Sequence, residues 1–110
     1  MVSEEEYVKL APIELKALLS ALDRLESDEL EVELENDILT LEFGDGAKYI
    51  VNSHRAARQI WMAADRSAWH YDFLPEVGKW VAQKSGDELW STLERALSGK
   101  LGIAVNLKLL

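Results

Sequence analysis

The sequence contains no cysteine, two prolines and two histidines among its 110 residues. The absence of cysteine excludes a disulfide scaffold, a zinc ribbon, an iron–sulfur cluster held by thiolates and a cysteine nucleophile. No apolar run approaches the roughly 20 residues that a membrane-spanning helix needs. Three of the first six residues are glutamates and none is basic, whereas a secretory or transit peptide is basic there. We therefore expect one soluble intracellular domain over residues 1–110.

The net charge of −8 is distributed unevenly along the chain. Residues 1–45 hold 14 acids and three bases, a net charge of −11, whereas residues 46–110 hold six acids and nine bases, a net charge of +3. The acidic part would repel a phosphate backbone, which argues against nucleic-acid binding through that surface. It would attract cations or a basic partner, although a surface that only confers solubility is the simpler interpretation.

Hydrophobic periodicity predicts a helix at each end of the chain. Ser3 and Glu6 form a capping box, and apolar residues then recur every three or four positions over the next twenty residues. Pro12 conflicts with an uninterrupted helix, so either the helix is kinked there or its regular part begins near Pro12. The second helix is introduced by Gly86-Asp87 and ends at Ser98-Gly99, with an apolar tail beyond it.

Between the helices, apolar residues alternate with polar ones, as in strands that bury one face. Asn36-Asp37 and Gly44-Asp45-Gly46 are typical of tight turns because these residues accept a positive φ. Strands joined by short turns pair antiparallel, and two flanking helices can cover one face of their sheet. The expected fold is therefore α+β, a two-layer sandwich whose antiparallel sheet has about six strands, at residues 30–35, 38–43, 48–52, 59–64, 69–73 and 79–83.

A run of eight acids, here called the acidic segment, follows the first helix: Asp23, Glu26, Asp28, Glu29, Glu31, Glu33, Glu35 and Asp37. Asp23 and Glu26 would share a helix face, and alternate glutamates would share a strand face. Like charges this close are destabilising, and a bound cation relieves the repulsion. Carboxylates alone suit Ca²⁺, Mg²⁺, Mn²⁺ or iron, so weak binding of exposed, hydrated ions is expected. The alternative, which composition alone slightly favours, is an edge charged to prevent strand pairing.

No catalytic motif is present in the sequence, so no catalytic residue is assigned. There is no Ser-His-Asp order, HExxH, GxGxxG or P-loop. His54 and His70 lack metal-ligand spacing and are interpreted as ordinary surface or core histidines. Trp80 and Trp90 fall at inward-facing positions and are assigned to the core.

Trp61 lies on the opposite side of its predicted strand from Ile60 and Met62. If these two pack under the helices, Trp61 is exposed beside Asn52 and Gln59 and becomes a candidate hot spot for protein binding, with Arg55 and Arg58 as a small basic rim. The equally weighted alternative is that a neighbour on the next strand covers the indole.

The ordered set of motifs resembles the frataxin family, including its bacterial CyaY members. The matching residues are Ile38-Leu39-Thr40-Leu41-Glu42-Phe43, Gly46, Tyr49-Ile50-Val51-Asn52, Arg58-Gln59-Ile60-Trp61-Met62-Ala63, His70-Tyr71-Asp72-Phe73, Lys79-Trp80, and Gly86 with Leu89 and Leu93. The spacing from Asn52 to Gln59 is that of the family, and the resemblance covers about residues 30–97. His54 stands where the family has glutamine, and Ala56 stands where a proline is usual.

The resemblance implies a frataxin-like fold and a role in iron–sulfur cluster assembly. Such a protein would bind Fe²⁺ or Fe³⁺ weakly, carry no organic cofactor, and dock on the complex of a cysteine desulfurase and its scaffold protein. The metal candidates implied by position are Asp23, Glu26, Asp28, Glu29, Glu31 and Glu33, and the partner-binding candidates are Asn52, Gln59 and Trp61. The alternatives are a ferroxidase or iron-storage protein that uses the same acids, and an adaptor that needs no metal.

The resemblance also bears on the state and location of the chain. A regulator of this kind would be a monomer, with iron-dependent oligomers as the alternative, and would contact neither nucleic acid nor membrane. Its expected location is the cytoplasm, or the mitochondrial matrix if the chain is a processed eukaryotic protein.

Self-repulsion within the acidic segment predicts a salt-dependent stability. Raising the ionic strength from about 0.01 M to about 0.15 M shortens the screening length from about 30 Å to about 8 Å, so the melting temperature should rise. Divalent cations that bind the folded chain should raise it further. Circular dichroism during a thermal scan measures both effects, and a melting temperature independent of salt would contradict the interpretation.

Overall fold

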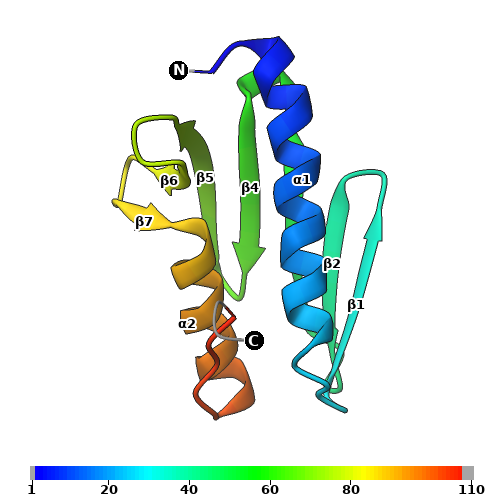
Figure 1. Cartoon of the computed structure of the whole chain (residues 1–110). Coiled ribbons are helices and arrows are strands. Elements are labelled where there is room, and N and C mark those ends of the chain that lie inside the picture. The colour runs from blue at the N-terminus through cyan, green and yellow to red at the C-terminus, as the bar shows by residue number, and fades with distance from the viewer. Residues whose placement is uncertain (1, 108–110) are drawn as a thin grey trace.

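The computed structural model describes residues 2–107 and places two helices against a single sheet (Figure 1). The elements are α1 (Glu4–Asp23), β1 (Leu30–Glu35), β2 (Ile38–Phe43), β3 (Lys48–His54), the 3₁₀ helix η1 (Arg55–Ala57), β4 (Gln59–Ala64), β5 (Ser67–Leu74), β6 (Lys79–Ala82), β7 (Asp87–Glu88) and α2 (Leu89–Leu101). Met1 and residues 108–110 of the predicted domain lie outside the described residues. No helix within the described range is long and apolar enough to cross a membrane.

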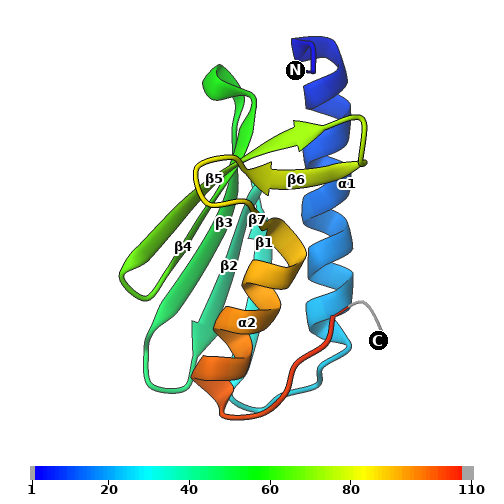
Figure 2. The same cartoon turned by 90° about the vertical axis from the view of Figure 1, so that its left-hand side faces the viewer.

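The expected α+β sandwich is confirmed, because both helices lie on the same side of an antiparallel sheet (Figure 2). Within the described residues the strands follow the order β1 to β7, seven rather than about six. The additional strand is Asp87–Glu88, which pairs with the end of β6. These residues were expected to start the second helix, and the helix instead begins at Leu89, where the Glu88 carboxylate accepts hydrogen bonds from the N–H groups of Trp90 and Ser91.

The end of α2 also differs from the prediction. The helix continues through Ser98-Gly99 to Leu101, and Gly102, with a φ of 71°, caps it in the left-handed conformation. A glycine after the helix is the usual cap because it has no Cβ to strain this conformation. The sequence offered two glycines three residues apart, and the second one terminates the helix.

Helix α1 begins where its capping box predicts. The Ser3 hydroxyl accepts a hydrogen bond from the Glu6 N–H at 3.1 Å, and the Glu6 carboxylate accepts one from the Ser3 N–H at 3.3 Å. Pro12 lies inside the helix, so the alternative start near Pro12 is wrong. Proline has no N–H, and the Val8 carbonyl therefore lacks its helical donor. The buried face compensates for this loss, with Tyr7, Ala11, Leu15, Leu18, Ala21 and Leu22 packed onto the sheet.

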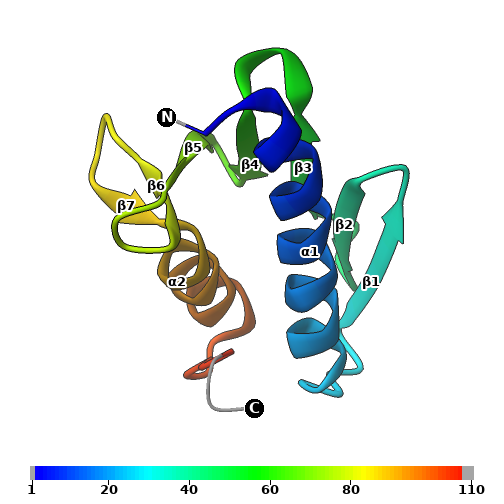
Figure 3. The same ribbon diagram turned by 45° about the horizontal axis from the view of Figure 1, so that its top comes forward.

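The core lies between the helices and the sheet face beneath them. Alternate strand residues reach it, each at most 5% exposed: Leu39, Leu41, Phe43, Tyr49, Val51, Ile60, Met62, Ala64, Tyr71, Trp80 and Ala82. The predicted core position of Trp80 is confirmed, whereas Trp90 is only half-buried and donates its indole N–H to Glu14 at 2.6 Å. The apolar tail returns between α2 and α1 (Figure 3), and buried Leu107 joins the core from it.

The other face of the sheet, here called the outer face, carries the alternate residues. Strand register brings Glu35 opposite Ile38, Ile38 opposite Asn52, Asn52 opposite Trp61, and Trp61 opposite His70. One row of side chains therefore crosses five strands, from the acidic edge strand β1 to β5.

Replacement of Pro12 by alanine tests the cost of the interrupted helix. The added N–H can donate to the Val8 carbonyl, and the free energy of unfolding should rise by about 1–3 kcal/mol. The greater freedom of alanine in the unfolded chain reduces the gain by about 0.4–1 kcal/mol. Urea denaturation measures the change. The neighbouring exposed substitution Ile13→Ala serves as the control, expected within about 0.5 kcal/mol of the native chain. A P12A variant no more stable than native would contradict the account.

Candidate functional site

Trp61 forms the middle ring of a three-ring stack on the outer face. The His54 ring lies against one face of the indole, with 3.8 Å between centroids and 11° between planes. The His70 ring lies against the other face, at 4.1 Å and 13°. The indole is half-buried, and because imidazoles cover both of its faces, its exposed part is the rim. Trp61 is therefore neither a fully exposed ring nor one that a neighbour hides.

A chain of hydrogen bonds fixes the polar edge of the same indole. The Trp61 N–H donates to Gln59 Oε1 at 2.8 Å, and Gln59 Nε2 donates to Asp72 Oδ1 at 3.2 Å. The second oxygen of Asp72 accepts a hydrogen bond from Gln83 Nε2 at 3.1 Å. A carboxylate only accepts hydrogen bonds, so Asp72 determines which end of the Gln59 amide faces the indole.

The three partner-binding candidates are brought together by this geometry. Asn52 is half-buried opposite Trp61 in the β3–β4 register, and its Nδ2 donates to the Ser53 carbonyl at 3.1 Å. Gln59 lies beside Trp61 through the hydrogen bond already described. The outer face thus holds all three side chains in one continuous surface.

Arg55 and Arg58, the predicted basic rim, are both engaged by residues at the N-terminal end of the chain. The Arg55 guanidinium forms an ion pair with Glu4 at 2.9 Å, and both side chains are more than half exposed. Arg58, in the left-handed conformation with a φ of 55°, donates to the Val2 carbonyl at 3.1 Å. Both arginines hold the start of α1 against the β3–β4 connection, which the sequence could not show because the contacts span more than 50 residues.

Four further residues belong to this surface without a motif that assigns them to it in the sequence: His54, His70, Asp72 and Gln83. From the sequence the two histidines are ordinary surface or core residues, and Asp72 and Gln83 have no role at the site. Residue parity was the available signal, because positions 59, 61, 70 and 72 alternate with core residues on their strands. A depression of about 630 Å³ opens beside them, lined by Gln59, Ala68, Trp69, His70, Asp72, Ala82, Gln83, Lys84 and Ser85.

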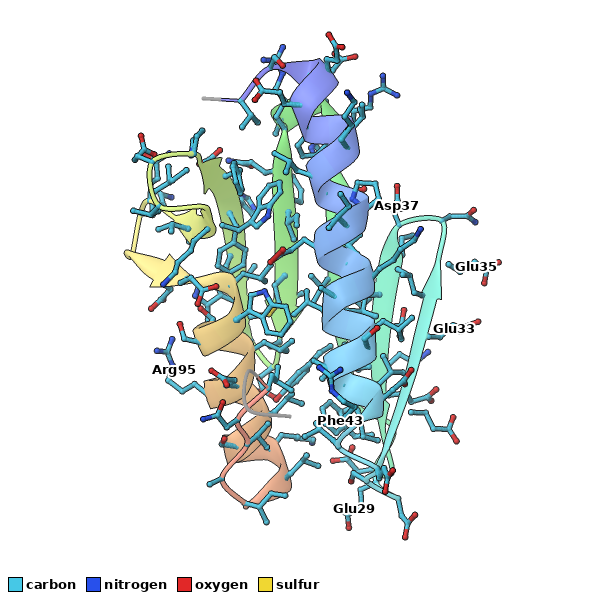
Figure 4. The ribbon with its side chains drawn as sticks, in the orientation of Figure 1. Glu29, Glu33, Glu35, Asp37, Phe43 and Arg95 are labelled. Atoms are coloured by element: carbon cyan, nitrogen blue, oxygen red, sulfur yellow. The ribbon has the colours of Figure 1, made fainter. Side chains whose placement is uncertain are left out.

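The metal candidates do not form a preformed site. All six side chains are exposed, and within residues 2–107 no group of three or more His, Asp or Glu side chains is placed to hold a metal ion. Figure 4 shows Glu33 and Glu35 pointing into solvent along β1, with Glu29 at one end of the edge hairpin and Asp37 at the other. Exposed hard donors without a cage do not fit a resident metal cofactor and suit only weak, hydrated binding.

The expected shared helix face of Asp23 and Glu26 is wrong. Helix α1 ends at Asp23, and Glu26 adopts a φ of 50° in the turn that leads to β1. The chain must reverse within six residues to enter β1 at Leu30, and this reversal takes Glu26 off the helix.

Four acids line one depression at this edge of the sheet, and one of them is not among the metal candidates. A depression of about 190 Å³ is lined by Asp28, Glu29, Glu31 and Glu42, together with Phe43 and Gly44. Glu42 pairs with Glu31 across β1–β2 and with Lys48 across β2–β3. The two-residue turn at Asn36-Asp37 already implied the Glu31–Glu42 pair, since it sets the register of the hairpin.

A cation is already present beside this end of the sheet. Lys100 Nζ donates to Asp45 Oδ2 at 2.6 Å and lies 5.5 Å from the centre of the Phe43 ring. The lysine, with the Ala47 N–H, lowers the pKa of the Asp45 carboxyl. Asp45 is therefore engaged by α2, whereas Asp28, Glu29, Glu31 and Glu42 form no ion pair within the described part of the chain.

Comparisons with known proteins agree in pointing to one family. A family model described as a frataxin-like domain matches residues 1–103. The iron-sulfur cluster assembly protein CyaY of Ralstonia nicotianae is 34% identical over 110 residues, covering 96% of this chain and 95% of that protein. The protein of the same name from Neisseria meningitidis is 31% identical, with 97% of each chain covered.

Two solved structures share the fold. A frataxin from Psychromonas ingrahamii superposes with a TM-score of 0.85 at 25% identity, covering 96% of this chain and 98% of that one. Yeast frataxin superposes with a TM-score of 0.66 at 31% identity, covering 86% of this chain and 83% of that one.

The carboxylate depression predicts where a paramagnetic ion concentrates. During titration with Mn²⁺, amide NMR signals of Asp28, Glu29, Glu31 and Glu42 should broaden before those of Glu5 and Glu76, which are exposed but isolated from the depression. The paired substitution E31Q/E42Q should abolish this preference, since it removes two of the four carboxylates. Broadening spread evenly over all surface acids, or absent from the depression, would contradict the expectation.

Proposed function

Because this chain belongs to the family of frataxin-like domains, we propose that it is an iron-binding regulator of iron–sulfur cluster assembly. It docks on the complex of a cysteine desulfurase and its scaffold protein, and it binds iron weakly as cargo. The observation that carries the proposal is the continuous outer face, on which one row of side chains joins the acidic edge to Trp61.

The aromatic part of the outer face supplies the short-range contact. Ile38 is 45% exposed and Ile50 is 37% exposed, and both lie on the same face as the rim of Trp61. A fixed aromatic residue surrounded by exposed aliphatic side chains is typical of a binding hot spot. The stacked histidines restrict the indole before any partner arrives, which reduces the entropy lost on binding.

The acidic part supplies long-range attraction. Glu31, Glu33 and Glu35 alternate along the exposed side of β1, and Glu35 lies opposite the exposed Ile38 of the outer face. Their charges would draw a basic patch on the desulfurase–scaffold complex toward the aromatic contact and accelerate association at low salt.

Two of these acids, Glu31 and Glu33, are also among the proposed iron ligands. Neighbouring carboxylates such as Glu31 and Glu42 offer hard oxygen donors, and their exposure leaves the ion hydrated and quick to leave. Such binding suits delivery or sensing of iron more than storage.

A regulator that acts by docking needs no catalytic residue of its own. The cytoplasmic location expected from the sequence stays a prediction.

Calorimetry with a reconstituted desulfurase–scaffold complex tests the docking. The native chain should bind, and E31K/E33K should raise Kd by about tenfold or more at low salt, because charge reversal at a charged interface costs at least about 1.4 kcal/mol. W61A should raise Kd by about 30-fold or more, as for a hot-spot residue. The control E5K/E76K makes the same change in net charge away from the outer face and should alter Kd by less than about threefold.

Desulfurase turnover, measured with and without this protein and with and without iron, identifies the regulatory role. Failure of the native chain to bind the complex, or equal effects of the two charge-reversed pairs, would overturn the proposal. Oligomers that form a mineral in Fe²⁺ and O₂ would favour the storage alternative instead.

A further inference from the structure

The Gln59 amide is engaged at both of its ends. Its oxygen accepts the Trp61 indole N–H at 2.8 Å, and its nitrogen donates to Asp72 at 3.2 Å. These two bonds fix the direction in which each end of the amide points, although the oxygen keeps a second lone pair and the nitrogen a second hydrogen. Gln59 is therefore placed to orient its neighbour, although its position had marked it as a partner contact.

We propose that Asp72, acting through Gln59, is the positioning residue that holds Trp61 in the orientation its partner binds. The inference rests on the proposed docking function and assigns a role to a residue outside the partner-binding candidates. Asp72 lies directly opposite Gln59 in the β4–β5 register, so the contact follows from strand pairing and not from a flexible loop.

Hydrogen-bond polarity allows the Gln59 amide only one orientation. Each oxygen of the Asp72 carboxylate accepts from one amide nitrogen, Gln59 on one side and Gln83 on the other. If the Gln59 amide turned over, its oxygen would face the Asp72 carboxylate and its NH₂ would face the indole N–H. Both new contacts would be repulsive, because acceptor would meet acceptor and donor would meet donor. Only one orientation of Gln59 therefore satisfies Asp72 and Trp61 together.

The hydrogen bonds and the ring stack constrain different motions of the indole. His54 and His70 limit tilting of its plane, since they lie within 11° and 13° of parallel on either side. Stacking alone still allows the ring to slide and turn within that plane. The hydrogen bond from the indole N–H to Gln59 opposes the in-plane motion, and Asp72 keeps the acceptor in place.

The consequence is an anchor that is already ordered before docking. Ordering a free side chain at an interface has a cost that corresponds to about a 3- to 10-fold change in Kd. Loss of the Asp72 contact should therefore weaken docking by about that factor while the contact atoms of Trp61 remain in place.

A polarity swap tests the proposal. D72A removes both acceptor oxygens, so it should release Gln59, shift the Trp61 indole N–H signal in a ¹H–¹⁵N NMR spectrum and raise Kd for the desulfurase–scaffold complex 3- to 10-fold. Q59E alone should do the same, because it places a carboxylate against Asp72. The double variant D72N/Q59E keeps the native net charge. The carboxylate at position 59 can accept from both the Trp61 N–H and the Asn amide at position 72, whose oxygen still accepts from Gln83, so both the signal and the affinity should recover.

The control is Q83A, which removes the other donor to Asp72 and leaves the Gln59 contact intact. It should leave the Trp61 signal and Kd near their native values, and thermal scans confirm that every variant is folded. An unchanged indole signal in D72A, or failure of the double variant to recover, would overturn the positioning role. Absence of binding by the native chain would overturn the docking function itself, and the two failures are thereby distinguished.

Discussion

The burial of one sheet face beneath two helices is the constraint on which the other features depend. Side chains alternate between the faces of a strand, so placing Leu41, Val51 and Met62 in the core sends their neighbours to the outer face. Side chains on the outer face do not form the core, so their identity is not constrained by core packing. The same alternation brings Asn52 and Trp61 together, because both are out of phase with the core residues of their strands.

The two parts of the outer face differ in how firmly their side chains are held. The carboxylates of β1 are exposed and extend into solvent (Figure 4), which suits charges that act over distance and ions that exchange quickly. The indole of Trp61 is held by two rings and a chain of hydrogen bonds, which suits a contact that must fit closely. Association and fit are thus assigned to different residues of one surface.

Most of the fold could be predicted because its signals are local. The capping box at Ser3, the alternation of the strands and the Asn36-Asp37 turn each depend on a few adjacent residues. The predicted element boundaries are wrong where contacts with distant residues decide between two conformations that the local sequence allows. Asp87–Glu88 became a strand because β6 offered a partner, and Glu26 left the helix because the chain had to turn into β1.

The candidate site shows the same division. The sequence by itself determined that acids gather over residues 23–37 and that Trp61 lies on the opposite strand face from Ile60 and Met62, since both follow from residue order and period. Only the tertiary structure decided that His54 and His70 enclose Trp61 and that Asp72 orients Gln59. These contacts join side chains of different strands, and their rings and amides meet only once the sheet has placed β3, β4 and β5 side by side.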